Sequence, residues 1–219
     1  MSQTHSARDE ESQQVTGSPS RLDRRKTRTR QALIDAARQI LMEKGSSDVS
    51  IQELTDLADV GFGSFYNHFT TKTELFEQAV GDILEEHGEQ LDRATVDMSD
   101  PAEVFATSVR ITVQLATNSP EVARVFSQGG LRFLIQDRGL APRALRDIRR
   151  GIESGRFVVA NPKVALACAA GCLFAFLQLR LEDPPSVADS DGDELAEQLL
   201  RMFGVPADSA HEIAHRSLP

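Results

Sequence analysis

Residues 50–72, SIQELTDLADVGFGSFYNHFTTK, constrain the fold of this chain more than any other segment. Apolar residues recur at helical spacing from Ile51 to Ala58, a short turn follows, and Phe65 and Phe69 are again about one helical turn apart. This pattern predicts two short helices around a tight turn. The segment after the turn carries aromatic, polar and basic side chains, which indicates a helix-turn-helix unit that reads DNA.

Capping signals mark where the helices around this segment begin and end. Ser50 and Glu53 have the spacing of a capping box, in which each side chain binds the free backbone amide of the other residue. Thr71 and Glu74 repeat that spacing, so a further helix should start there. Upstream, an apolar stripe predicts a longer first helix that ends at Gly45.

Around this segment the sequence resembles the N-terminal domain of the TetR family of bacterial transcriptional regulators. The resemblance rests on TRQALIDAARQILMEKG, then SIQELTDLADVG, then GSFYNHFTTKTELF, and its FYNHF-TTK-L part is highly specific to the family. Asp59 replaces the usual glycine of the turn, and Gly61 replaces the usual small hydroxyl residue that opens the recognition helix. We expect the turn to survive, because aspartate tolerates the left-handed conformation, but Gly61 removes a hydroxyl cap.

The resemblance implies a homodimer whose two recognition helices enter successive major grooves of a palindromic double-stranded operator. The residues that match the family's phosphate contacts are Tyr66, His68 and Lys72. Those that would face base edges or thymine methyl groups are Gln52, Phe62, Ser64 and Asn67. For Phe62, a hydrophobic plug between helices is the alternative.

Charge is distributed unevenly along the chain. The net charge of the whole chain is −9, which by itself opposes binding to DNA. Residues 21–30, however, contain six basic residues and one acidic residue. Affinity for phosphate depends on the local field, so an acidic protein can still present a basic face. We expect this basic stretch, including Arg25 and Arg28, to precede the first helix and to contact DNA. A solvated tail is the alternative.

Helix signals continue beyond residue 72, and no alternating strand pattern persists, so the fold class is predicted to be all-α. Asp100 and Pro101, for example, give an N-cap and a first-turn proline in succession. A three-helix DNA-binding head should be joined by a long helix to an α-helical ligand-binding and dimerisation domain. The predicted boundaries are a disordered tail 1–20, a helix-turn-helix domain 21–72 (27–87 for the family-type domain), a connecting helix 73–97 and a C-terminal domain 98–219.

The longest uncharged apolar run covers residues 164–177 and lies within a predicted helix 162–181. The run is shorter than the roughly 18–20 residues that span a membrane, so it predicts a packed helix, no membrane partner and a cytoplasmic protein. A helix that is apolar on nearly every side needs neighbours on every side. We therefore expect a homodimer through this helix and a second helix 194–203, with burial inside one monomer as the alternative.

A ligand cavity is predicted in the C-terminal domain. Its expected lining residues are Phe105, Val109, Phe126, Phe133, Phe157, Leu173, Phe174 and Gln178. Almost none of these side chains carries a charge, so a lipophilic or aromatic effector is favoured over a sugar or a metal. The prediction is a repressor that a small ligand releases from DNA by population shift. A ligand-independent activator or architectural DNA-binding protein is the alternative.

Two further patterns point to other chemistry. His211, Glu212 and His215 match H-E-x-x-H, which places two zinc-binding imidazoles on one helix face. No downstream residue supplies a third ligand, so we expect a chance match, no cofactor or metal and no enzyme, with a zinc hydrolase as the remote alternative. Cys168 and Cys172 are one helical turn apart and are interpreted as buried small residues, a redox pair or a pocket position being the alternatives.

Overall fold

The computed structural model describes residues 20–129, 137–188 and 190–219 of the 219-residue chain. Over these ranges all the regular elements are helices and none is a strand, which confirms the all-α prediction. The predicted disordered tail, apart from residue 20, lies outside the described residues, and so does Phe133.

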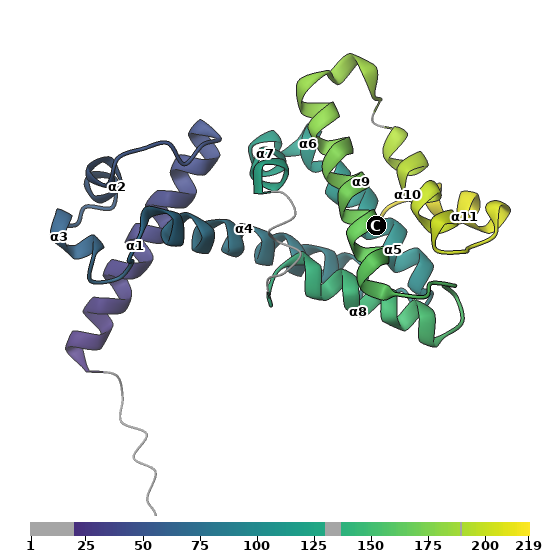
Figure 1. Cartoon of the computed structure of the whole chain (residues 1–219), viewed down its shortest axis with the longest axis horizontal. Coiled ribbons are helices and arrows are strands. Elements are labelled where there is room, and N and C mark those ends of the chain that lie inside the picture. Colours follow the sequence, from purple (N-terminus) through teal and green to yellow (C-terminus); the bar gives the residue numbers. More distant parts are fainter. Residues whose placement is uncertain (1–19, 130–136, 189) are drawn as a thin grey trace, which may run out of the picture.

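The head and the C-terminal domain lie at opposite ends of the molecule, and α4 runs lengthwise between them (Figure 1). The head consists of α1 (Arg21–Lys44), α2 (Ile51–Leu57) and α3 (Phe62–Phe65), followed by α4 (Lys72–Ala94). The later helices are α5 (Pro101–Val113), α6 (Leu115–Asn118), α7 (Pro120–Gly129), α8 (Leu140–Glu153), α9 (Pro162–Glu182), α10 (Asp191–Met202) and α11 (Ala207–Ala214). A 3₁₀ turn, η2 (Pro184–Ser186), follows α9.

Local capping sets the boundaries of the head helices as the sequence predicts. The Ser50 hydroxyl accepts from the Glu53 amide at 3.1 Å, and the Glu53 carboxylate accepts from the Ser50 amide at 2.9 Å. Gly45 ends α1 in the left-handed conformation with φ 60°. Asp59 also lies there, with φ 53°, so the turn survives its missing glycine. Gly61 provides no side-chain cap for α3, again as expected.

The basic stretch forms the first turns of α1, so the prediction that it precedes the first helix is wrong. The reason is a capping box just before the basic stretch, which the sequence analysis did not identify. The Ser20 hydroxyl accepts from the Asp23 amide, and the Asp23 carboxylate accepts from the Ser20 amide, each at 3.1 Å. Aspartate here performs the role that glutamate performs beside Ser50. The basic residues are therefore held on a helix rather than on a loose arm.

Each end of the molecule has its own core rich in aromatic side chains. In the head, Phe65 and Phe69 are fully buried, and Val125 of α7 packs against the same cluster. In the C-terminal domain, Phe105, Phe157 and Phe203 form a trio whose ring centroids are 4.8–6.1 Å apart. Because α7 reaches the core of the head, the head is anchored to the C-terminal domain by more than α4 alone.

Among the residues that the structure describes, one face of α9 is exposed. Val164 and Leu179 are 57% and 46% exposed, and Cys168 and Cys172 are also exposed. The interpretation of the cysteines as buried is therefore wrong within one protomer. At 21 residues α9 is longer than the predicted apolar run, and by length and composition alone it is apolar enough to cross a membrane.

Candidate DNA-binding surface and ligand pocket

The short helix α3 has one side buried in the head and the other side exposed. Phe65 faces the core of the head, so its neighbours along α3 and the following turn face outward. Phe62 is 48% exposed and Tyr66 57% exposed, and their rings meet edge to face with centroids 6.0 Å apart. A plug between helices requires burial, which the exposure of Phe62 does not provide. Asn67 is exposed beside them and Ser64 is half-buried.

The neighbouring polar side chains differ in exposure and in the hydrogen bonds that they already make within the head. Arg25 and Arg28 are exposed on α1, whereas the exposed Gln52 donates its amide to Asp56 at 2.6 Å. The pKa of His68 is lowered, first by burial and then by the positive charges of Lys26 and Arg30. A neutral imidazole keeps one N–H, which can donate to a phosphate oxygen.

Lys72 connects two parts of the head. Its Nζ donates to the backbone carbonyl of Val49 at 2.7 Å, which ties the start of α4 to the segment before α2. An ammonium group has three N–H donors, so two remain after this bond. The position therefore fits a residue that holds the head together and also faces a phosphate.

A cavity of about 110 Å³ lies between α4, α5, α7, α8 and α9. Five predicted pocket residues are brought together here: Phe105, Val109, Phe126, Leu173 and Phe174. Phe157 lies instead in the aromatic core of the C-terminal domain, and Gln178 is exposed on α9 away from the lining. The remaining lining residues are Leu84, Leu91, Asp92, Thr95, Ser108, Thr112, Leu140, Ala141, Arg143, Ala144, Asp147, Leu166, Ala169 and Ala170.

Charged lining residues were missed by the sequence analysis, which expected almost none. Arg143 of α8 binds two acids of α4, with its Nη2 2.7 Å from Glu85 and its Nε 2.7 Å from Asp92. Burial alone would raise the pKa of Asp92, but hydrogen bonds from Arg143 and Arg146 outweigh it and lower that pKa. The partners are more than 50 residues apart in the chain, so no local pattern could have paired them.

A buried histidine lies behind the cavity wall. His87 of α4 is 3% exposed, and its Nε2 lies 3.0 Å from the hydroxyl of Thr112. That hydroxyl donates to the Ser108 carbonyl at 2.7 Å, so the Nε2–H of His87 must be the donor in their bond. Burial lowers the pKa of His87 to about 4, so the ring is neutral at pH 7. Its edge also meets the ring of Phe126, which lines the cavity, at 5.4 Å.

An exposed recognition helix, a basic first helix and a cavity at the far end of α4 together define a helix-turn-helix DNA-binding regulator. The chain belongs to the TetR family of bacterial transcriptional regulators. Residues 33–79 match the family described as "Bacterial regulatory proteins, tetR family", and residues 100–216 match "Tetracyclin repressor-like, C-terminal domain".

Individual relatives agree with this assignment. RolR in complex with the ligand resorcinol is 37% identical, with a TM-score of 0.77, covering 90% of this chain and 97% of that chain. RolR without ligand is 36% identical, with a TM-score of 0.73, covering 86% and 98%. The HTH-type transcriptional repressor DhaR of Mycobacterium sp. (strain GP1) is 35% identical over 79 residues, 36% of this chain. That match spans only 38% of the length of DhaR.

Membership in this family decides one of the open alternatives. TetR-family proteins are DNA-binding transcriptional regulators and not enzymes, so the prediction that the chain is not an enzyme is confirmed and the zinc hydrolase is set aside.

Proposed function

We propose that the protein is a cytoplasmic repressor that leaves a palindromic operator when a small hydroxylated aromatic compound enters its cavity. The observation that carries this proposal is the cavity itself, with apolar walls, the hydroxyls of Ser108 and Thr112, and the Asp92–Arg143 pair. An apolar cavity of about 150 Å³ accepts benzene in another protein, so about 110 Å³ suits one ring. The resorcinol held by RolR belongs to this chemical class.

The proposed DNA contacts divide by chemistry. Residues for phosphate are Arg25, Arg28, Tyr66, His68 and Lys72, and residues for base edges are Gln52, Phe62, Ser64 and Asn67. The exposure of Phe62 and Tyr66 and the basic start of α1 support this division. We also propose that the predicted domains have separate roles. Residues 21–72 would bind DNA, and residues 98–219 would bind the ligand and the second subunit.

The proposed coupling between cavity and head runs through α4. Arg143 joins α8 to Glu85 and Asp92 at the cavity end of α4. At the residue after Glu85, the two terminal nitrogens of the Arg38 guanidinium each donate to one oxygen of Glu86 at 2.6 Å, which joins α4 to α1. A ligand that favours one placement of α8 thereby biases the position of the head. Its effect is limited to its differential affinity for the two states.

The proposed dimer forms through the exposed apolar face of α9. Val164, Cys168 and Leu179 lie on that face and are exposed in the described part of the protomer. The outward face of α10 is polar instead, with Glu194 and Arg201 exposed. We therefore assign the main contact to α9 and a smaller one to α10.

Resorcinol should lower the affinity of the dimer for its operator by at least about tenfold, which is within the usual range of allosteric coupling. The operator would first be selected from random duplexes, and affinity would be measured by fluorescence anisotropy at fixed salt. Benzene serves as the control, because it fills the cavity without donating hydrogen bonds. If no phenol among a panel of mono- and dihydroxybenzenes changed the affinity, the proposed effector class would be wrong.

Phe174→Ala should change the response to resorcinol while it leaves operator affinity intact. Phe174 is half-buried at the cavity, so its loss should cost only about 1–2 kcal/mol of unfolding free energy, below the usual cost of a fully packed phenylalanine. Phe126→Ala is the matched control, because Phe126 also lines the cavity but is 1% exposed. Urea denaturation should show the larger loss for Phe126→Ala. Equal losses with unchanged ligand response would remove Phe174 from the pocket.

A further inference from the structure

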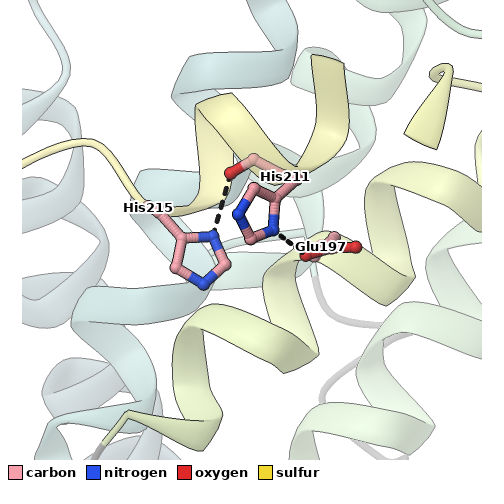
Figure 2. A group of neighbouring side chains, drawn as sticks. All are labelled: Glu197, His211 and His215. Carbon is pink, nitrogen blue, oxygen red and sulfur yellow. Dashed lines mark hydrogen bonds and ion pairs between the residues drawn. The ribbon is translucent and has the colours of Figure 1, made fainter. Parts of the chain in front are cut away.

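Three potential metal ligands meet where α10 and α11 pack together. Glu197 of α10 and His211 and His215 of α11 each offer a ligand atom, and these atoms lie within 4.8 Å of one another (Figure 2). The two histidines are four residues apart, so they share one helix face, and their ring centroids are 4.1 Å apart. The Nδ1 of His211 lies 2.9 Å from the Glu197 carboxylate.

The surroundings orient these side chains as ligands. The Nδ1 of His215 lies 2.9 Å from the backbone carbonyl of His211. A carbonyl only accepts, so Nδ1 carries the hydrogen, and Nε2 of the neutral ring keeps a lone pair for a metal. The Glu197 side chain is 15% exposed and lies 3.7 Å from the Arg201 guanidinium, whereas that of His211 is 66% exposed. One side of the group is thus fixed, and the other is open for an ion and its water.

The third ligand comes from an earlier helix and not from the residues after His215. The sequence pattern identified no third ligand, because the residues after His215 offer none and no signal singles out His87 or a distant acid. The turn between α10 and α11 brings such an acid, Glu197, back beside the histidines. Glu212, the acid inside the H-E-x-x-H pattern, instead pairs with Arg216 at 2.8 Å. The arrangement therefore differs from that of a hydrolase, in which the internal glutamate is the base.

We propose that Glu197, His211 and His215 bind a zinc-class divalent cation, with water as the fourth ligand. Two imidazole nitrogens and one carboxylate oxygen suit such borderline cations. The ligand atoms around tetrahedral zinc are about 3.3 Å apart. Small side-chain rotations would bring the three ligand atoms, now within 4.8 Å of one another, to that spacing. Exposed histidines can make such rotations.

The ion would act as a staple for the end of the chain. It would join α11 to α10, and the segment after α11 is already tied to α5 because Arg110 donates to the Arg216 carbonyl at 2.6 Å. Arg110 also holds Asp193 of α10 at 2.6 Å. The cation would complete this set of links on the side of α5 that faces α10 and α11. Its expected effect is added stability of the C-terminal domain.

The test uses untagged, metal-free protein titrated with ZnCl₂ in a calorimeter, with Co²⁺ absorption as a reporter of coordination. We expect one Zn²⁺ per chain and a melting temperature that rises with Zn²⁺. His215→Ala should abolish both effects, and Glu197→Gln should weaken binding at least about tenfold, because it keeps the side-chain shape but removes the anionic ligand. Glu212→Gln is the matched control and should bind like the wild type.

Circular dichroism without metal would establish that each variant is folded before it is titrated. The proposal is overturned if the wild type binds no Zn²⁺ at 100-fold excess over protein. It is equally overturned if folded His215→Ala and Glu197→Gln bind as tightly as the wild type, since the ion would then be held elsewhere. If Glu212→Gln weakened Zn²⁺ binding and Glu197→Gln did not, the carboxylate ligand would be Glu212, and the proposed site would be wrong.

Discussion

Leu199→Glu should unfold the C-terminal domain. Leu199 is 2% exposed and belongs to the core cluster that contains Phe105 and Phe203. Glutamate at this position would be a buried carboxylate without a partner, at a cost of about 5 kcal/mol. Most domains are stable by only about 5–15 kcal/mol, so little of the folded state would remain. Loss of the helical circular dichroism signal and a lowered urea midpoint would be the measurements.

Val164→Glu provides the comparison, because Val164 lies on the exposed face of α9. This variant should keep its helical signal and its melting behaviour as a protomer but run as a monomer in light scattering. A Leu199→Glu protein that stayed folded and became monomeric would place Leu199 at the dimer contact. A dimeric Val164→Glu would move the contact away from this face of α9.

Leu199 also shows where sequence periodicity stops being informative. An apolar stripe on a helix predicts that one face is buried, but it does not say against which neighbour. Leu199 was expected in the dimer contact, and it lies instead in the protomer's own core against α5. On α9 the apolar residues surround the helix and predicted neighbours on every side, whereas one face is exposed among the described residues, so a partner subunit on that face stays a prediction.

Signals within one helical turn were the reliable ones. The Ser50–Glu53 capping box, the end of α1 at Gly45 and the left-handed Asp59 all follow from adjacent side chains and backbone. The pairs that shape the candidate sites are distant instead, such as Asp92 with Arg143, 51 residues apart. Glu197 and His211 are likewise on different helices, 14 residues apart. Only packing of the helices brings such groups together, so the sequence alone did not pair them.

Acidification from pH 7 to pH 4 should remove about 3 kcal/mol of unfolding free energy through His87 alone. Burial lowers the pKa of His87 from 6.5 to about 4 in the folded protein, while the unfolded chain keeps the ordinary value. Between these two values the unfolded chain binds the proton and the folded chain does not. The stability contribution is therefore fully present above pH 6.5 and is lost as the pH falls through the window to 4.

His87→Gln isolates this effect, because its amide can still donate to Thr112 but does not titrate. Hydrogen bonds from Arg143 and Arg38 lower the pKa values of Glu85 and Glu86, so both proteins should also lose stability as these acids protonate. That loss is shared, and the difference between the two proteins in urea denaturation at pH 7, 6, 5 and 4 reports His87. We expect the difference to shift by about 3 kcal/mol in favour of the variant as the pH falls. Parallel curves would mean that His87 stays as accessible to protons in the folded protein as in the unfolded chain, and that the wall behind the cavity is open to water.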